Sequence, residues 1–211
     1  MGMKELWLIR HGETEWNVKK RFQGHLDVPL SPAGIGQAFR LAQRLLRSQL
    51  SFAGLFSSDL RRARETAEPL AAVLGLPLKT TPLLREIDVG ALAGLSREEA
   101  EAQYPEFVQA AREDPWHTAR PGGESMADLA RRLEAFLETL PPGRHLLVTH
   151  GGVIRAALKM ALDLEGDAWR RFHIPNTSIT RILLPEREVL AVSDSAHLET
   201  WADWLSDESV K

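Results

Sequence analysis

The segment Leu6-Trp7-Leu8-Ile9-Arg10-His11-Gly12 is a short apolar run that stops abruptly at a group of polar residues. A run of this length and composition is typical of a strand that is buried inside a sheet. Val148-Thr149-His150-Gly151 repeats the design, because there too a buried strand ends in histidine and glycine. Ligands of open α/β sheets bind beyond the carboxyl ends of the strands, so we expect His11 and His150 on the same side of the molecule.

Two helices are predicted in the first half of the chain. Ser31-Pro32 has the pattern of a helix start, with serine as the cap and proline at the first helical position. The residues expected on the apolar face of that helix are Ile35, Ala38, Phe39, Ala42, Leu45 and Leu46. A second short strand at 55–58 is followed by Asp59, which we expect to cap a helix that ends near Leu74.

The second half of the sequence continues to alternate between strand and helix patterns. The predicted strands are 76–79, 145–149, 179–184 and 188–192, and the predicted helices are 126–140 and 153–162. Residues 96–123 are mixed and polar, with only a short helix at their start, where Ser96 and Glu99 resemble a capping box. Strands that alternate with helices predict an α/β protein with a layered sheet.

The bulk composition describes an ordinary globular protein. The chain has 211 residues, of which 44% are hydrophobic and 26% are charged, and this size allows one substantial core. We therefore expect a single domain over residues 1–211. A net charge of −3 gives the whole molecule no attraction to nucleic acid or to an anionic membrane, so neither is expected as a partner.

Two absences exclude further classes of chemistry. The chain has no cysteine, which excludes disulfides, a thiolate nucleophile and cysteine-ligated metals, and which fits a cytoplasmic protein. No apolar run approaches the roughly 18 residues needed to span a bilayer, and the first residues show no signal-peptide pattern. We expect a soluble protein without a membrane partner.

Either histidine alone could be a core or turn residue whose ring is satisfied by hydrogen bonds. Two histidines at matching strand ends, one of them beside Arg10, favour a binding site instead. Arginine at an exposed strand end is well suited to bidentate phosphate recognition. The glycine after each histidine lets a ligand come close, and His150 also lies at a predicted helix N-terminus, which favours an anion.

Two more charged residues can reach the same crevice. Arg62 lies in the first turn after the strand 55–58, whereas its neighbours Arg61 and Arg64 are expected to be solvated. Glu86 follows another predicted strand and, taken alone, would be a surface or capping carboxylate. Against a pocket of two arginines and two histidines, it gains a further role as the proton donor to a leaving alkoxide.

Several blocks of the sequence together resemble the histidine phosphatase superfamily, in its phosphoglycerate-mutase-like branch. The blocks follow one another in the family's order over almost the whole chain. They are residues 8–14 with Asn17, 23–30, 36–38, 57–67, 84–86 with Gly90 and Gly94, 121–125, 148–152 and 194–198. The resemblance implies a three-layer α/β/α sandwich with a mostly parallel central sheet.

The resemblance also implies a role for each residue of the candidate site. His11 would be the nucleophile that takes the phosphoryl group on a ring nitrogen, and Glu86 would protonate the departing oxygen. The non-bridging oxygens would be held by Arg10, Arg62, Asn17 and His150, and the matching residues Gln23, Gly24 and Gly151 are also expected to bind substrate. These groups would compensate the phosphoryl charge that magnesium compensates elsewhere, so we expect no metal and no cofactor.

The sequence leaves the protonation state of His11 open. The attacking nitrogen must be unprotonated. Nearby guanidinium groups oppose the imidazolium form, whereas an incoming phosphate dianion favours it.

Three other functions agree less well with the sequence than a phosphatase does. Cofactor-dependent phosphoglycerate mutases resemble this chain but carry a longer segment between the acid and the second histidine, where this chain has only residues 87–149. A catalytically silent binding protein on the same fold should lack a catalytic residue. Here all five expected catalytic residues are present, namely Arg10, His11, Arg62, Glu86 and His150. A metal hydrolase is disfavoured because the seven histidines form no His-Glu-x-x-His motif.

Residues 87–123 are expected to form a cap that selects the substrate, a small phosphorylated metabolite. Trp116 and Arg120 are candidates to contact the leaving group. Arg120 would be available to a carboxylate on that group. Equally, Trp116 can simply pack the segment down and Arg120 can be solvated. Phosphoglycerate, phosphoserine, α-ribazole phosphate and sugar phosphates all stay open, and so does a homodimer, because the sequence does not determine the oligomeric state.

Overall fold

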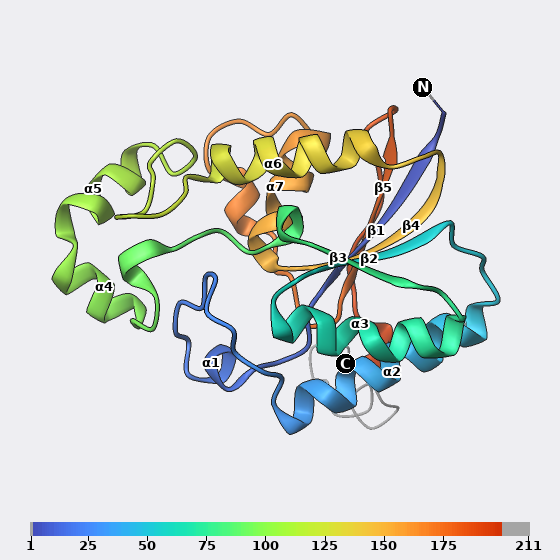
Figure 1. The fold of residues 1–211 in the computed structure, drawn as a ribbon. Helices are drawn as coiled ribbons and strands as arrows, with labels where there is room; N and C mark the ends of the chain where they lie inside the picture. The colour runs from blue at the N-terminus through green and yellow to red at the C-terminus, as the bar shows by residue number, and fades with distance from the viewer. Residues whose placement is uncertain (1, 200–211) are drawn as a thin grey trace, which may run out of the picture.

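A computed structural model describes residues 2–199 of the chain (Figure 1). Its centre is a six-stranded sheet with the strand order β3-β2-β4-β1-β5-β6. The strands are β1 (Lys4–Arg10), β2 (Gly54–Ser58), β3 (Leu78–Thr81), β4 (Gly143–Thr149), β5 (Ile179–Leu184) and β6 (Glu188–Asp194). The first four are parallel to one another, whereas β5 pairs antiparallel with β1 and β6 pairs antiparallel with β5. The sheet is therefore mostly parallel, as predicted.

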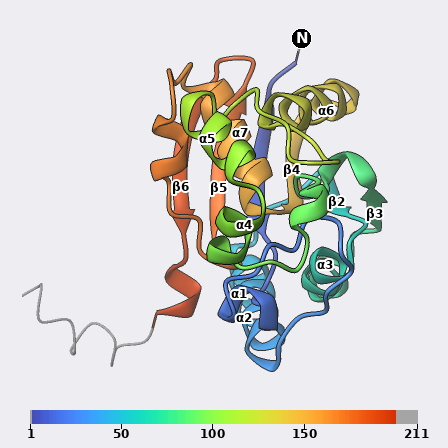
Figure 2. The same cartoon turned by 90° about the vertical axis from the view of Figure 1, so that its left-hand side faces the viewer.

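Helices cover both faces of the sheet (Figures 1 and 2). On one face lie α2 (Pro32–Ser48) and α3 (Arg61–Leu74), and on the other lie α6 (Met126–Thr139) and α7 (Gly151–Ala161). The shorter elements are α1 (Glu15–Val18), α4 (Arg97–Gln103), α5 (Pro105–Glu113), η1 (Pro82–Leu84), η2 (Gly90–Leu92), η3 (Ala168–Arg171) and η4 (Ala196–Leu198). The expected three-layer α/β/α sandwich is confirmed.

Strand β1 shows why its sequence is an unbroken apolar run. Trp7 and Ile9 are buried against α2 and α3, whereas Leu6 and Leu8 are buried against α6 and α7. Successive side chains of a strand point to opposite faces, and here both faces are covered by helices. The part of the strand between the two helix layers, Leu6 to Ile9, is therefore apolar at every position.

The apolar face predicted for α2 is partly wrong. Ala38, Ala42 and Leu45 are buried as expected, and Leu41 joins them. The predicted core residues Ile35, Phe39 and Leu46 are instead 47%, 55% and 52% exposed. The buried positions 38, 41, 42 and 45 follow the spacing of a single helical stripe, and the three misplaced residues lie along its flank.

The predicted cap of α3 is also wrong. The helix begins at Arg61 behind Leu60, which makes no side-chain capping bond, and the Asp59 carboxylate instead pairs with the Arg85 guanidinium at 2.7 and 2.6 Å. The main-chain N–H of Arg61 donates to Asp27 Oδ1 at 2.6 Å. A carboxylate from a loop 34 residues earlier thus satisfies the first turn of the helix.

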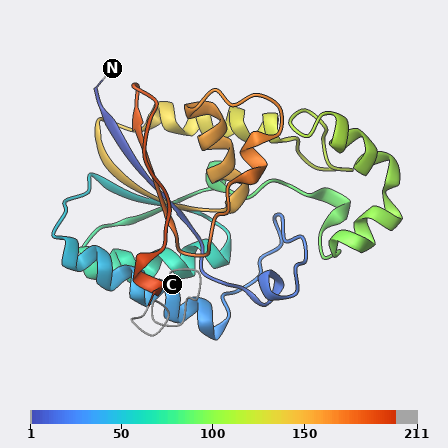
Figure 3. The ribbon, with the colours of Figure 1, turned by 180° about the vertical axis from the view of Figure 1, so that it is seen from behind.

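Residues 96–123 contain more helix than predicted. The short helix α4 begins at the expected capping box of Ser96 and Glu99, but a second helix, α5, follows it directly. Figures 1 and 3 show α4 and α5 standing beyond the sheet, on the same side of the molecule as α1. The segment has the right position for a substrate cap, and its role as a cap stays a prediction.

Within residues 2–199 there is no helix with the length and apolarity that crossing a membrane requires.

Candidate active site

The two histidine-bearing strands end side by side. Strands β1 and β4 are parallel with Arg10 opposite Thr149, and the N–H of His11 donates to the carbonyl of Thr149 at 2.9 Å. The rings of His11 and His150 lie 5.1 Å apart, centroid to centroid. The expectation that both histidines reach the same side of the molecule is therefore confirmed.

His11 is held as a neutral ring with a defined tautomer. Its Nδ1 lies 2.6 Å from the carbonyl oxygen of Gly12, and since a carbonyl only accepts, Nδ1 carries the proton. Burial, together with the positive charges of Arg62 and Arg10, places the pKa of His11 well below 6.5. The lone pair is consequently on Nε2 in the free protein, so in the absence of a bound dianion the opposing guanidinium groups prevail.

His150 is completely buried and caps α7 with its backbone in the extended conformation. Neither ring nitrogen has a hydrogen-bond partner among residues 2–199. Burial is the main reason that the pKa of His150 is well below 6.5, and the charge of Arg62 adds to it. Buried polar atoms without partners are rare, so this ring is prepared for a ligand.

Arg62 is 1% exposed although it carries a full charge. Its Nη1 and Nη2 donate to the carbonyls of Leu26 and Gly24, both at 2.8 Å. Burial lowers the pKa of Arg62 to about 10, which leaves the guanidinium charged at neutral pH. Its Nε is buried without a partner in the described part of the chain.

Arg10 repeats this arrangement. Its Nη1 donates to the carbonyl of Ile174 at 2.6 Å, its Nε is buried and unpartnered among the described residues, and burial lowers its pKa. Arg10 and Arg62 both act on the pKa of His11, so the two charges are close to that ring. Buried, unpaired nitrogen atoms on two cations and one imidazole make a site that a compact anion would complete.

Glu86 lies against the first turn of α7. The N–H of Gly152 donates to its Oε2 at 3.2 Å and the N–H of Ile87 to its Oε1 at 2.9 Å. The backbone of Glu86 is fixed as well, because Arg132 Nη2 and His25 Nε2 both reach its carbonyl, at 2.9 and 2.8 Å. Its charge attracts both Arg10 and Arg62, so the carboxylate belongs to the same cluster.

The segment after β1, which includes α1, contributes Asn17, Gln23 and Gly24. The Oδ1 of Asn17 accepts from the N–H and hydroxyl of Thr14, at 3.0 and 3.1 Å, and Gln23 Oε1 accepts from the same hydroxyl at 3.0 Å. Gly24 adopts a positive φ of 49° and supplies the carbonyl that binds Arg62. The predicted binding residues of this segment thus form hydrogen bonds with Thr14 or with Arg62.

Gly151 brings two arginines together at the start of α7. A Cβ atom at this position would lie 3.2 Å from Arg155 Nη1 and 3.7 Å from Arg10 Nε. Arg155 was not among the predicted site residues, and its Nε donates to the carbonyl of Phe172 at 3.1 Å. Arg155 follows Gly151 by four residues at the start of a predicted helix, and this spacing, which places the two on the same face, was the signal that could have identified it.

The two predicted cap contacts have different surroundings. Trp116 packs edge-on against Trp169, with ring centroids 5.7 Å apart, and Lys159 Nζ stands 5.0 Å above its ring. These contacts favour the interpretation of Trp116 as a packing residue. Arg120 is partly buried, which lowers its pKa, and its charge is attracted by Glu86. That attraction indicates that Arg120 lies near the site.

Two further residues at the site had no signal in the sequence. Asn176 Nδ2 donates to the carbonyl of His11 at 2.9 Å and to Asn17 Oδ1 at 3.3 Å. The N–H of Thr177 donates to the carbonyl of Arg10 at 2.9 Å. Both lie in an irregular stretch before β5, where no periodic pattern points to them.

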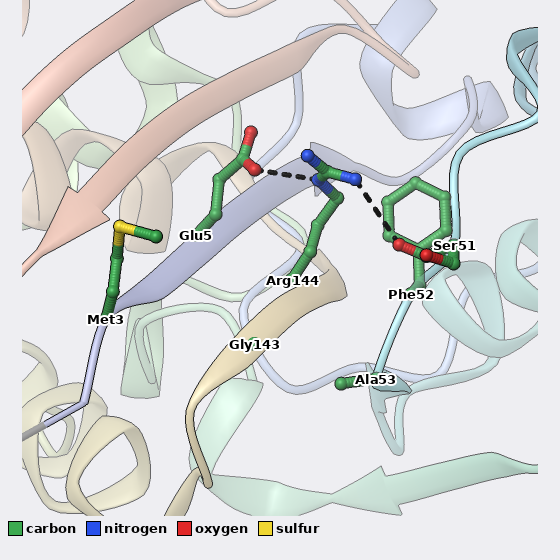
Figure 4. Close-up of a pocket in the computed structure, with 7 residues that line it drawn as sticks. All are labelled: Met3, Glu5, Ser51, Phe52, Ala53, Gly143 and Arg144. Carbon is green, nitrogen blue, oxygen red and sulfur yellow. Dashed lines mark hydrogen bonds and ion pairs between the residues drawn. The ribbon is translucent and has the colours of Figure 1, made fainter.

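Neither of two surface hollows contains this cluster. One, of about 440 Å³, lies at the opposite edge of the sheet, where β1 and β4 begin (Figure 4). Its lining includes Glu5 and Arg144, which form an ion pair at 2.7 Å. In the described part of the chain, no group of three His, Cys, Asp or Glu side chains is arranged to hold a metal ion.

Known proteins resemble this chain in sequence and in fold. It is 35% identical over 208 residues to "Probable phosphoglycerate mutase GpmB" of Yersinia pestis (strain Pestoides F), covering 93% of this chain and 96% of that protein. A mycobacterial glucosyl-3-phosphoglycerate phosphatase solved with VO3 has a TM-score of 0.75 and 36% identity, over 84% of this chain and 92% of that one.

A structure from Escherichia coli named "putative alpha-ribazole-5'-P phosphatase" has a TM-score of 0.80 at 26% identity, over 91% of this chain and 97% of that one. A family profile, "Histidine phosphatase superfamily (branch 1)", matches residues 6–194. The family match includes both His11 and His150, and the chain belongs to branch 1 of the histidine phosphatase superfamily.

Proposed function

We propose that the protein is a metal-independent phosphomonoesterase that hydrolyses small phosphorylated metabolites through a phosphohistidine on His11. The observation that carries this proposal is the state of the His11 ring. Its Nδ1 proton is fixed on the Gly12 carbonyl and its pKa is well below 6.5. Nε2 is therefore available as a nucleophile at neutral pH, next to the guanidinium groups of Arg10 and Arg62.

The first half of the reaction transfers the phosphoryl group. Nε2 of His11 attacks phosphorus, the P–N bond forms and the bond to the ester oxygen breaks. Glu86 gives a proton to the departing oxygen, so that the leaving group is an alcohol. Arg10, Arg62, Asn17 and His150 bind the equatorial oxygens, and the unpaired Nε atoms of the two arginines are the donors free to do so.

The second half returns the enzyme to its initial state. Glu86, now a carboxylate, takes a proton from water, and the oxygen of that water attacks the phosphohistidine. The P–N bond breaks, inorganic phosphate leaves and Nε2 regains its lone pair. The positive charge needed at phosphorus comes from arginines, which supports a reaction without a metal ion.

We further propose that the favoured esters carry a second negative charge. Arg120 and Arg155 both have charges attracted by Glu86, and Arg170 is near enough to repel Arg120. None of the three forms an ion pair with another residue of the 2–199 segment. A leaving group with a carboxylate would meet these charges, and two of the relatives above are named for phosphoglycerate compounds.

A phosphoglycerate mutase is the second candidate, and the name of the Yersinia pestis relative favours it. A mutase must keep its phosphoenzyme from water and pass the phosphoryl group to a second hydroxyl. The short connection between Glu86 and His150, residues 87–149, favours hydrolysis, because the longer segment that the mutases carry is missing.

One experiment separates these functions. Inorganic phosphate release is measured with excess EDTA on a panel that includes 3-phosphoglycerate, phosphoserine, a sugar phosphate and p-nitrophenyl phosphate. We expect release with EDTA present, and highest kcat/KM on the esters that carry a carboxylate. Conversion of 3-phosphoglycerate to 2-phosphoglycerate without phosphate release would establish the mutase, and neither reaction would point to a binding protein.

A further inference from the structure

Thr177 has an unusual backbone next to the proposed nucleophile. It is completely buried and has a φ of +57°, a left-handed conformation that is rare for a β-branched residue. In this conformation its N–H donates to the carbonyl of Arg10 at 2.9 Å and approaches that of His11 at 3.4 Å. The preceding residue, Asn176, donates to the His11 carbonyl from its side chain. The turn at 176–177 thus holds the backbone of the Arg10–His11 segment.

A strained turn of this kind persists only when its surroundings hold it. The hydroxyl of Thr177 lies 3.0 Å from Nε2 of His197, in the short η4 turn after the last strand. Nδ1 of the same ring faces Arg44 Nη1 at 3.4 Å. A guanidinium only donates, so Nδ1 accepts, and Nε2 therefore carries the proton and donates to the Thr177 hydroxyl.

The position of His197 is itself fixed. Arg44, on α2, pairs with Asp194 through two hydrogen bonds of 2.8 and 2.5 Å, and this ties the start of η4 to the helix layer under the sheet (Figure 3). Burial and the charge of Arg44 lower the pKa of His197 to about 4, although Asp194 opposes this and Arg40 adds to it. The ring is accordingly neutral at the pH of most assays, as the hydrogen bond from Nε2 requires.

We propose that His197 is a positioning residue for catalysis, which holds Thr177 in its left-handed turn and thereby fixes the backbone of Arg10 and His11. This inference rests on the proposed function, in which His11 attacks phosphorus. His197 itself does not touch the substrate. Misplacement of a nucleophile by a fraction of an ångström is enough to lower the rate, so the effect appears in kcat rather than in the overall stability.

Two neutral amides provide a matched test. The amide nitrogen of glutamine can take the place of Nε2, whereas the side chain of asparagine ends near the position of Nδ1 and does not reach Thr177. We expect His197→Gln to retain most of the wild-type kcat on p-nitrophenyl phosphate and His197→Asn to lose on the order of tenfold, with similar melting temperatures for both. Equal kcat for the two variants would overturn the proposal.

Repeating the His197→Asn substitution in a Thr177→Gly enzyme tests whether His197 acts through Thr177. Glycine adopts a positive φ without strain, so Thr177→Gly removes the reason for the support. We expect His197→Asn to reduce kcat in the Thr177 enzyme but to have little further effect in the Thr177→Gly enzyme. The same loss in both backgrounds would show that His197 acts by another route, and the positioning proposal would fall.

A third measurement does not depend on turnover. Exchange of the Thr177 amide hydrogen, followed by NMR, should stay slow in His197→Gln and become faster in His197→Asn, because its bond to the Arg10 carbonyl would weaken. If the wild type hydrolyses no ester, the proposed function fails, and this exchange rate still decides whether His197 holds the turn. Unchanged protection in His197→Asn would contradict the proposal.

Discussion

The N–H of Gly152 donates to Oε2 of Glu86 at 3.2 Å, and a Cβ atom at residue 152 would stand 2.2 Å from Oε1 of the same carboxylate. The proposed acid can lie in this place only because residue 152 has no side chain. One glycine thereby sets the position of the proton donor.

Gly152→Ala is therefore predicted to displace Glu86 and slow the protonation of the leaving oxygen. Hydrolysis of an alkyl phosphate should fall by about a hundredfold, whereas p-nitrophenyl phosphate, whose leaving group needs little protonation, should lose much less. Glu86→Gln should give the same pattern. The control is Gly36→Ala on α2, where the added methyl group meets nothing within 4 Å. Equal losses on the two substrates would argue against Glu86 as the acid.

Removal of the nucleophile should separate activity from folding. His11→Ala is expected to lower kcat by at least about a thousandfold and to leave the far-ultraviolet circular dichroism spectrum unchanged. His173→Ala, at an exposed histidine, provides the control and should retain activity. Mass spectrometry of acid-labile phosphate after rapid mixing with substrate should find it on the wild type only. Residual turnover by His11→Ala at the wild-type rate would exclude the phosphohistidine.

Much of this site could be predicted from the sequence because it lies on strand ends. The apolar run of β1 and the matching end of β4 place Arg10, His11 and His150 at one edge through the geometry of parallel strands. The two layers of helices follow from the alternation of strands and helices. These features depend on local periodicity, which a single sequence displays.

Other features depend on contacts between distant segments. Asp27 reaches the start of α3 from 34 residues away, which left Asp59 as the only visible cap. Helix α5 spans only nine residues and has no buried residue, so its apolar pattern is too short to identify it. Asn176 and Thr177 act through an irregular turn, and the neutral state of His11 depends on burial by the whole fold.

The buried histidines should make the protein less stable in mild acid. The pKa values of His11 and His150 lie well below 6.5 in the folded state, and that of His197 is about 4. In the unfolded chain these groups have pKa values near 6.5, so below that pH the unfolded state binds more protons. The buried histidines therefore leave the free energy of unfolding undiminished above pH 6.5. They lower it as the pH drops from 6.5 toward their folded-state pKa values.

Urea unfolding at pH 7.5 and pH 5.0 measures this change. At pH 5.0 most carboxylates with lowered pKa values are still ionised, so the histidines dominate the difference. His197→Gln has no ring to protonate, and we expect its free energy of unfolding to fall less between the two pH values than that of the wild type. His173→Gln, at an exposed position, should behave like the wild type. An identical fall in His197→Gln would contradict the lowered pKa of His197.

Arg120 tests whether the cap recognises a second charge. Its guanidinium is partly buried and is attracted by Glu86 but forms no ion pair within residues 2–199, so a substrate carboxylate can pair with it. Arg120→Ala is expected to raise KM for 3-phosphoglycerate by about tenfold, the value of one charge-assisted hydrogen bond, and to leave KM for p-nitrophenyl phosphate almost unchanged. Arg131→Ala removes an exposed arginine that pairs with Asp128 on α6 and should affect neither substrate. A parallel rise in KM for both esters in Arg120→Ala would show that Arg120 supports the cap rather than selecting the leaving group.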